Sequence, residues 1–161
     1  MTADLSALIA RLEAAEAGSR ELDAKIALLC LPEFSGWIEH PANNGNQYGE
    51  LAPSREAFDE WLIRDGDPCL IAAPLHTISL DAALALAERV LGTDQEYEIT
   101  TLYNIARVTL NMNHGDESGP FYGSNDCCVV PLAICAATLR AKLDGYAAEG
   151  EVNKNPKAQE G

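Results

Sequence analysis

The most constraining feature of this sequence is a pair of segments in which apolar and polar residues alternate on either side of a short turn. Residues 96–101 (EYEITT) and 106–112 (ARVTLNM) have this pattern, and Leu102–Asn104 separates them. A period of two on both sides of a turn predicts an antiparallel hairpin with one buried and one solvated face. In the first strand the buried face is predicted to hold Tyr97, Ile99 and Thr101. Because a two-stranded ribbon is marginal alone, helices must cover its apolar face.

The N-terminal region predicts two helices. Ala3–Ala17 has leucine and isoleucine at offsets of three and four, and Gly18 is expected to end this helix. Ser19 is a good N-cap for a second helix, which Pro32 stops.

The C-terminal half predicts two further helices. Ser79 caps the third, and Gly92 ends it. Its predicted buried stripe consists of Leu80, Ala83, Leu84, Ala87 and Leu91. Pro131 suits the first turn of the last helix, which runs to about Ala148 and has the largest apolar stripe. A turn-rich loop precedes it, with a short edge strand expected at Phe121-Tyr122.

Residues 31–72 form a polar, proline-punctuated segment that reads as an acidic insertion or long loop. Between residues 31 and 69 there are eight acids and two bases, a local charge of −6. Ser54 is placed to cap a short helix over Arg55–Ile63. At 161 residues the chain predicts a single α+β domain over 1–149, followed by a disordered tail at 150–161.

Charge and cysteine content narrow the classes of function. The net charge of −14 disfavours direct nucleic-acid binding, which requires neutralisation of phosphates. No apolar stretch approaches the ~20 residues that cross a bilayer, and the N-terminus lacks an export signal, so a bacterial cytoplasmic location is expected. The five cysteines have no Cys-x-x-Cys spacing, which predicts unpaired thiols.

The common catalytic and cofactor motifs are missing from the sequence. It has no Gly-x-Ser-x-Gly and no glycine-rich phosphate loop. The group His114, Asp116, Glu117, Cys127 and Cys128 matches no metal-ligand spacing. We therefore expect no catalytic residues, no metal and no cofactor.

Two binding surfaces remain as hypotheses. The first is a partner-protein surface on the acidic insertion, whose aromatic residues either anchor a partner or pin the insertion to the core. Its candidate residues are Trp37, Tyr48, Glu56, Asp59, Glu60 and Trp61. The alternative is a site for a nucleotide-like small molecule at the start of the third helix, formed by His76, Ser79 and Arg107. The competing interpretation of His76 is a loop histidine beside the core.

Three segments in order carry a family resemblance: residues 18–27 (GSRELDAKIA), 76–84 (HTISLDAAL) and 131–141 (PLAICAATLRA). Together with the strand pair they resemble the phage "ABA sandwich" family of small phage and prophage proteins. The resemblance implies an α/β/α layered domain and brings no catalytic residues. His76 replaces a frequent aromatic residue, and the segment 31–72 is longer than in typical relatives.

Charge, motifs and resemblance together predict a non-enzymatic phage or prophage accessory protein. We expect it to bind a host protein, such as a defence or nucleic-acid-handling factor, through an acidic surface. The last helix also leaves a homodimer open as an expectation.

Overall fold

The computed structural model describes residues 2–40, 47–54, 56, 70–93, 95–112 and 120–145, and it confirms the α+β class. The larger elements are α1 (Thr2–Ala14), α2 (Arg20–Cys30), α4 (Leu80–Leu91), β4 (Gln95–Leu102), β5 (Ile105–Met112), β6 (Phe121–Asn125) and α5 (Val130–Leu143). The segment between α2 and α4 contains the short 3-10 helix η1 (Pro32–Phe34) and the strands β1 (Ile38–Glu39), β2 (Glu50–Ala52) and β3 (Ile71–Ala72).

The predicted hairpin is present and belongs to a three-stranded antiparallel sheet of order β4-β5-β6. Leu102 pairs with Ile105, so only Tyr103 and Asn104 form the turn. The predicted edge strand at Phe121-Tyr122 is confirmed and extends to Asn125, pairing along β5.

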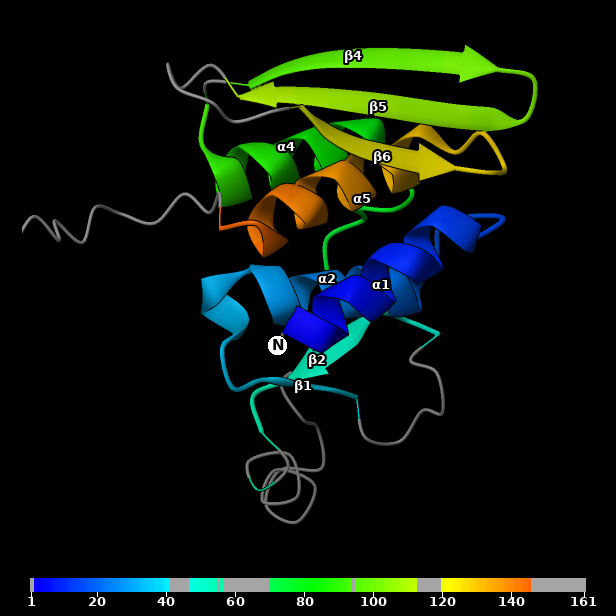
Figure 1. The fold of residues 1–161 in the computed structure, drawn as a ribbon. Helices are drawn as coiled ribbons and strands as arrows, with labels where there is room; N and C mark the ends of the chain where they lie inside the picture. The colour runs from blue at the N-terminus through cyan, green and yellow to red at the C-terminus, as the bar shows by residue number, and fades with distance from the viewer. Residues whose placement is uncertain are drawn as a thin grey trace, which may run out of the picture.

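The elements stack as sheet, helices, helices and sheet (Figure 1). The α5 helix packs on β5 and β6 and also contacts α1 and α4. Beyond them, α2 contacts β1, which belongs to a second small sheet of order β1-β2-β3. Consequently α5 is enclosed on several sides, and every residue from Leu132 to Leu139 is buried. A helix buried on all sides has no narrow stripe, so its apolar surface is wider than the sequence pattern predicts.

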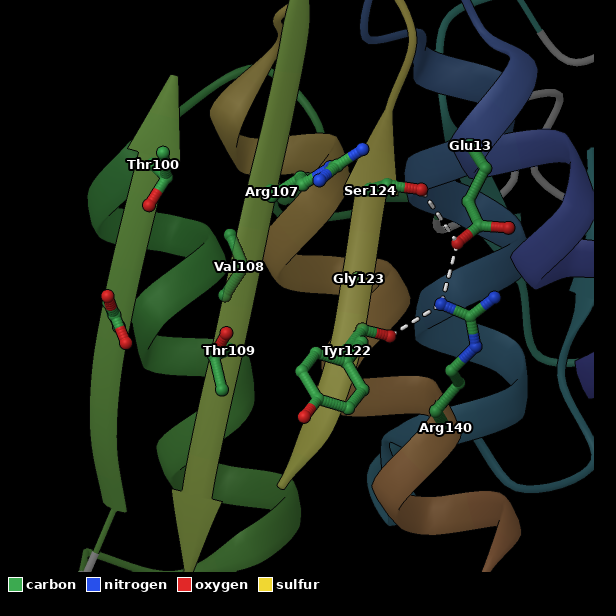
Figure 2. Close-up of a pocket in the computed structure, with 10 residues that line it drawn as sticks. Glu13, Thr100, Arg107, Val108, Thr109, Tyr122, Gly123, Ser124 and Arg140 are labelled. Carbon is green, nitrogen blue, oxygen red and sulfur yellow. Dashed lines mark hydrogen bonds and ion pairs between the residues drawn. The ribbon is translucent and has the colours of Figure 1, made fainter. Parts of the chain in front are cut away.

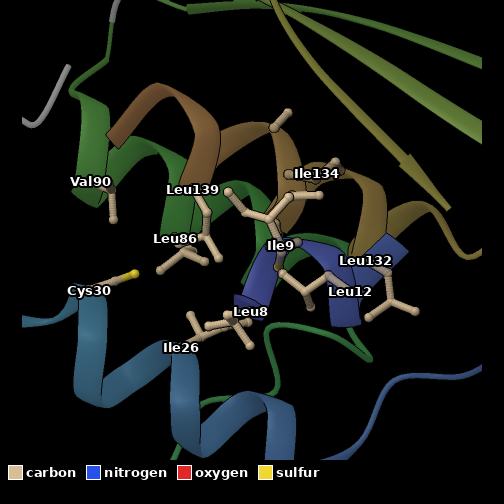
Figure 3. Close-up of a cluster of buried hydrophobic side chains, with 14 of the residues drawn as sticks. Leu8, Ile9, Leu12, Ile26, Cys30, Leu86, Val90, Leu132, Ile134 and Leu139 are labelled. Carbon is tan, nitrogen blue, oxygen red and sulfur yellow. The ribbon is translucent and has the colours of Figure 1, made fainter. Parts of the chain in front are cut away.

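The main hydrophobic core lies between α5 and the helices around it (Figure 3). Leu12 of α1, Ile26 of α2 and Leu86 of α4 are all fully buried in this cluster. On the opposite side of α5, Gly123 of β6 is so close to the helix that an added Cβ would lie 2.0 Å from the carbonyl oxygen of Ala133. The sheet therefore contacts the α5 backbone directly at this position.

The prediction that the first helix reaches Ala17 is wrong, because α1 ends at Ala14. The cause is Asn125, whose Nδ2 donates to the carbonyl oxygens of Leu12 at 3.0 Å and Ala15 at 2.8 Å. These bonds satisfy carbonyl groups at the helix end and link it to β6. Gly18 does not end the helix but allows a close backbone contact, because an added Cβ there would lie 2.2 Å from the carbonyl oxygen of Thr77.

Two predicted apolar faces are also corrected. In α4 the buried residues include Leu86 and Val90, whereas Leu80 is exposed and Leu84 is only half-buried. The buried face of the helix is therefore rotated toward Leu86 and Val90, and the small residues Ala83 and Ala87 are fully buried on it. In β4, Tyr97 packs against the core.

Ile99 and Thr101 of β4 are exposed, although the alternation places them on the buried face. Figure 1 shows the hairpin continuing past the end of the helical layer, which explains this exposure.

The acidic segment 31–72 is more than an insertion. It supplies buried core residues at Leu31, Phe34 and Leu51, and the second sheet is built from it. The helix predicted over Arg55–Ile63 falls almost wholly outside the described residues, as do the predicted end of the last helix near Ala148 and the tail 150–161.

A buried polar network joins α2 to the segment before α4. The Asp23 side chain is fully buried and accepts hydrogen bonds from both the backbone N–H and the hydroxyl of Thr77, each at 2.8 Å. Nη1 of Arg20 lies 2.6 Å from the other carboxylate oxygen. Arg20 also donates to the carbonyl oxygen of Ala73 at 2.5 Å. The Asp23 carboxylate and the Arg20 guanidinium therefore hold α2 to the segment before α4.

None of the helices in the described part of the chain is long and apolar enough to cross a membrane. Within that same part, Cys30, Cys127, Cys128 and Cys135 are free thiols, and Cys69 falls outside it. Burial raises the pKa of Cys30 to about 12. This thiol is therefore a core side chain and not a nucleophile.

Candidate functional site

The outer face of the three-stranded sheet carries polar side chains in two rows. The strand register places Thr100, Arg107 and Ser124 in one row across β4, β5 and β6. Glu98, Thr109 and Tyr122 form the next row. Paired residues share a face in antiparallel sheets, so all six side chains lie on the side opposite α5.

These two rows line a half-open pocket of about 550 Å³ (Figure 2). Glu13 from α1 and Arg140 from α5 line it too, at the edge of β6. Nη1 of Arg140 contacts Glu13 Oε1 at 2.6 Å and donates to the carbonyl oxygen of Tyr122 at 2.5 Å. The Ser124 hydroxyl donates to the same Glu13 oxygen at 3.3 Å. The three side chains and the β6 backbone thus form one fixed wall, which also caps the free edge of β6.

Arg107 is the available cation of this pocket. Its side chain is exposed and has no hydrogen-bond or ion-pair partner among the described residues. Glu98, one row away, is also exposed and also has no hydrogen-bond or ion-pair partner among the described residues. Unlike Arg140, whose guanidinium is already occupied, Arg107 is free to bind an incoming group.

The β4–β5 hairpin presents a second exposed feature, its tip. Tyr103 is 92% exposed and Leu102 is 62% exposed. Tyr103 also has a φ of +53°, a region that costs a residue other than glycine about 1–2 kcal/mol. A large aromatic residue held in this conformation in full contact with solvent contributes nothing to the core, which favours an interaction role.

The predicted partner surface is only partly within the described residues. Trp37 is half-buried, and its ring meets that of Phe34 edge-on at 5.4 Å, so it secures the segment to the core. Tyr48 is exposed, and its carbonyl oxygen accepts a hydrogen bond from Arg20 at 3.2 Å. Glu56 is exposed. Asp59, Glu60 and Trp61 lie outside the described residues.

The predicted ligand site at the start of α4 is divided in the structure. His76 is buried, and its Nδ1–H donates to the carbonyl oxygen of Ala82 at 3.1 Å. The Ser79 hydroxyl accepts from the backbone N–H of Ala82 at 3.3 Å as a helix cap. Arg107 lies in the outer-face pocket, which neither His76 nor Ser79 lines. His76 therefore fits the interpretation of a histidine beside the core.

His76 predicts an acid-sensitive fold. Burial lowers the pKa of His76 below its usual 6.5, and its Nε2 has no hydrogen-bond partner within the described part of the chain. The unfolded chain then binds the proton first, so the free energy of unfolding should fall as the pH drops below about 6.5. One proton corresponds to at most about 1.4 kcal/mol per pH unit. Urea unfolding of wild type and His76→Gln between pH 7.5 and 5.5 measures this slope, which should be smaller in the variant; equal slopes would contradict the assignment.

Comparison with protein-family models, curated proteins and solved structures found no match. The described residues contain no group of three or more histidine, cysteine or acidic side chains that could hold a metal ion. The site must therefore be interpreted from its own geometry.

Most of the pocket was missed by sequence reasoning. The sequence groups Arg107 with His76 and Ser79, neither of which lines this pocket. The polar positions of the two alternating segments include Glu98, Thr100 and Thr109, and the strand pairing places these residues beside Arg107. No sequence signal indicated Arg140 or Glu13, because they reach the sheet only through helix packing.

Proposed function

We propose that this chain is a non-enzymatic protein-binding module that adds an extended segment of a partner to the free edge of β4. The family resemblance suggests the setting, a phage or prophage accessory protein acting on a host protein. The observation that carries the proposal is the eight-residue strand β4, which is paired only with β5 among the described strands. A long exposed strand edge is a template for strand addition.

The backbone geometry identifies the groups that face the partner. In a hairpin with a two-residue turn, the pair next to the turn exchanges hydrogen bonds, and here that pair is Leu102 and Ile105. Bonding alternates along the strand, so even-numbered residues of β4 bond to β5. The N–H and C=O groups of Tyr97, Ile99 and Thr101 therefore point to the free edge.

The side chains around this edge suggest the chemistry of the partner. Glu96 and Glu98 are exposed on the outer face of β4, and Ile99 is 42% exposed on the other face. An extended segment with basic residues on one side and apolar residues on the other complements both faces. The exposed Tyr103 at the tip adds an aromatic contact of the kind that dominates interface energies. The proposed partner-binding surface is therefore acidic, as the sequence predicts, but it lies on the β4–β5 hairpin and not on residues 31–72.

Peptides with alternating lysine and valine test the proposal directly. The full chain should bind such a peptide in fluorescence polarisation, and the same peptide N-methylated at every second residue should bind at least about tenfold more weakly because it cannot donate to the edge. Equal affinity of the two peptides, or no binding of either, would contradict strand addition.

A matched pair of variants locates the binding at β4. Ile99→Pro removes an edge-facing N–H and leaves the ladder to β5 intact, so peptide affinity should fall about tenfold or more with little change in the circular dichroism spectrum. Ile99→Thr retains this N–H and a β-branched side chain, and should lose much less affinity. If the two variants bind equally, the edge of β4 is not the site.

A further inference from the structure

The outer-face pocket shares Glu98 and Thr100 with β4, but most of its lining comes from β5, β6, α1 and α5. We infer that this pocket binds a small phosphate monoester that carries a planar ring with hydrogen-bond donors, the chemistry of a nucleoside monophosphate. The inference rests on four properties of the pocket: a guanidinium and a carboxylate that have no partner among the described residues, an exposed aromatic ring one row from the guanidinium, and a rigid wall.

Arg107 supplies the phosphate contact. It stands in the middle strand of the sheet, with the hydroxyl groups of Thr100 and Ser124 on either side in the same row. A guanidinium forms two parallel hydrogen bonds to a phosphate, and the Thr100 hydroxyl is placed to donate to a remaining oxygen, whereas the Ser124 hydroxyl already donates to Glu13. Arg107 has no competing partner among the described residues, so a ligand need not displace an existing ion pair.

Tyr122 and Glu98 supply the contacts for the ring. Tyr122 is 60% exposed on β6 and lies one row from Arg107 on the neighbouring strand. Such diagonal neighbours are about 7–8 Å apart, a separation that lets one small molecule contact both. The tyrosine ring offers a face for stacking. The Glu98 carboxylate accepts from N–H or O–H groups, which a bare phosphate ion lacks, so it favours the ring-bearing ligand.

The local charge of the pocket suits an anion in spite of the acidic chain. Its charged lining residues are Glu13, Glu98, Arg107 and Arg140, whose formal charges cancel. The chain as a whole carries −14. An approaching phosphate therefore meets a neutral pocket in which the negative member of one pair, Glu13, is already held by Arg140.

Calorimetric titration of the full chain with adenosine monophosphate, ribose 5-phosphate, adenosine and inorganic phosphate tests the inference. The nucleotide should bind most tightly, because it alone engages both rows. Arg107→Gln should weaken its binding about tenfold or more, as expected for loss of hydrogen bonds to a charged group. Arg89→Gln on α4 is the matched control. It removes the same charge, from an exposed ion pair between Arg89 and Glu33, and should leave the affinity for the nucleotide within about twofold.

A second variant separates the two halves of the site. Tyr122→Leu should weaken nucleotide binding about fivefold or more and leave ribose 5-phosphate binding unchanged, because only the stacking contact is lost. The inference is overturned if no probe binds, or if adenosine binds as tightly as its monophosphate. Equal losses in Arg107→Gln and Arg89→Gln would also overturn it, because they would indicate a general charge effect. Equal affinity for inorganic phosphate and nucleotide would also overturn the inference, because it would show that the ring makes no contact with the pocket.

Discussion

Replacing Asp23 with alanine is expected to lower the free energy of unfolding by about 3–5 kcal/mol. The substitution removes the acceptor of the Thr77 backbone N–H and hydroxyl, and it leaves the Arg20 guanidinium without its carboxylate. These groups are buried or half-buried, so water replaces the lost bonds poorly. A domain is commonly stable by only about 5–15 kcal/mol, so the variant should unfold at a much lower urea concentration.

Glu21→Ala is the control for this prediction. Glu21 lies on the same helix and pairs with Arg11 at 3.0 Å, but both side chains are partly exposed. Exposed pairs contribute about 0–1 kcal/mol, so the control should retain most of the stability. A loss in Asp23→Ala no larger than in the control would show that the network does not hold α2 to the segment before α4.

Replacing Gly123 with alanine is expected to cost about 3 kcal/mol, at the upper end for overpacking. The new methyl group would lie 2.0 Å from the Ala133 carbonyl oxygen and 2.6 Å from the Ala137 nitrogen. Both atoms belong to the α5 backbone, which is enclosed by the core and cannot shift as a flexible side chain can. Thermal and urea unfolding would measure the loss.

Ser124→Ala tests whether position on the strand matters. Ser124 is adjacent to Gly123 but faces the outer pocket, where its hydroxyl makes one hydrogen bond to Glu13 at 3.3 Å. Its replacement should cost about 1 kcal/mol or less. If Gly123→Ala were no more damaging than Ser124→Ala, the close approach of β6 to α5 would not govern stability.

Local sequence signals predicted those helix starts and strand pairings that depend on residues close together in the sequence. Ser19 and Ser79 cap helices as expected, because capping involves neighbouring residues only. The alternation around the turn predicted the strand pairing, with Tyr97 opposite Leu110 on one face. The early end of α1 could not be predicted, because Asn125, more than 100 residues away, binds its last carbonyl groups.

The candidate site was less accessible to prediction for the same reason. Periodicity distinguishes the two faces of a strand but does not show how far the covering helices extend. Ile99 was therefore assigned to the buried face and is exposed. Arg140 joins the pocket because α5 lies against β6, a packing contact that the helical pattern alone does not specify.

The contact between α1 and α5 has a consequence for how the protein is made. The apolar face of α1, with Leu5, Leu8 and Leu12, is buried chiefly against a helix that begins at Val130. At synthesis rates of about 5–20 residues per second, the ribosome extends the chain for on the order of ten seconds between the two. During that time α1 lacks the main part of its native cover, and only its smaller contact with α2 can form. Nascent chains interrupted before Val130 should therefore be held by chaperones or degraded, and the N-terminal half should acquire protease resistance only when the chain is almost complete.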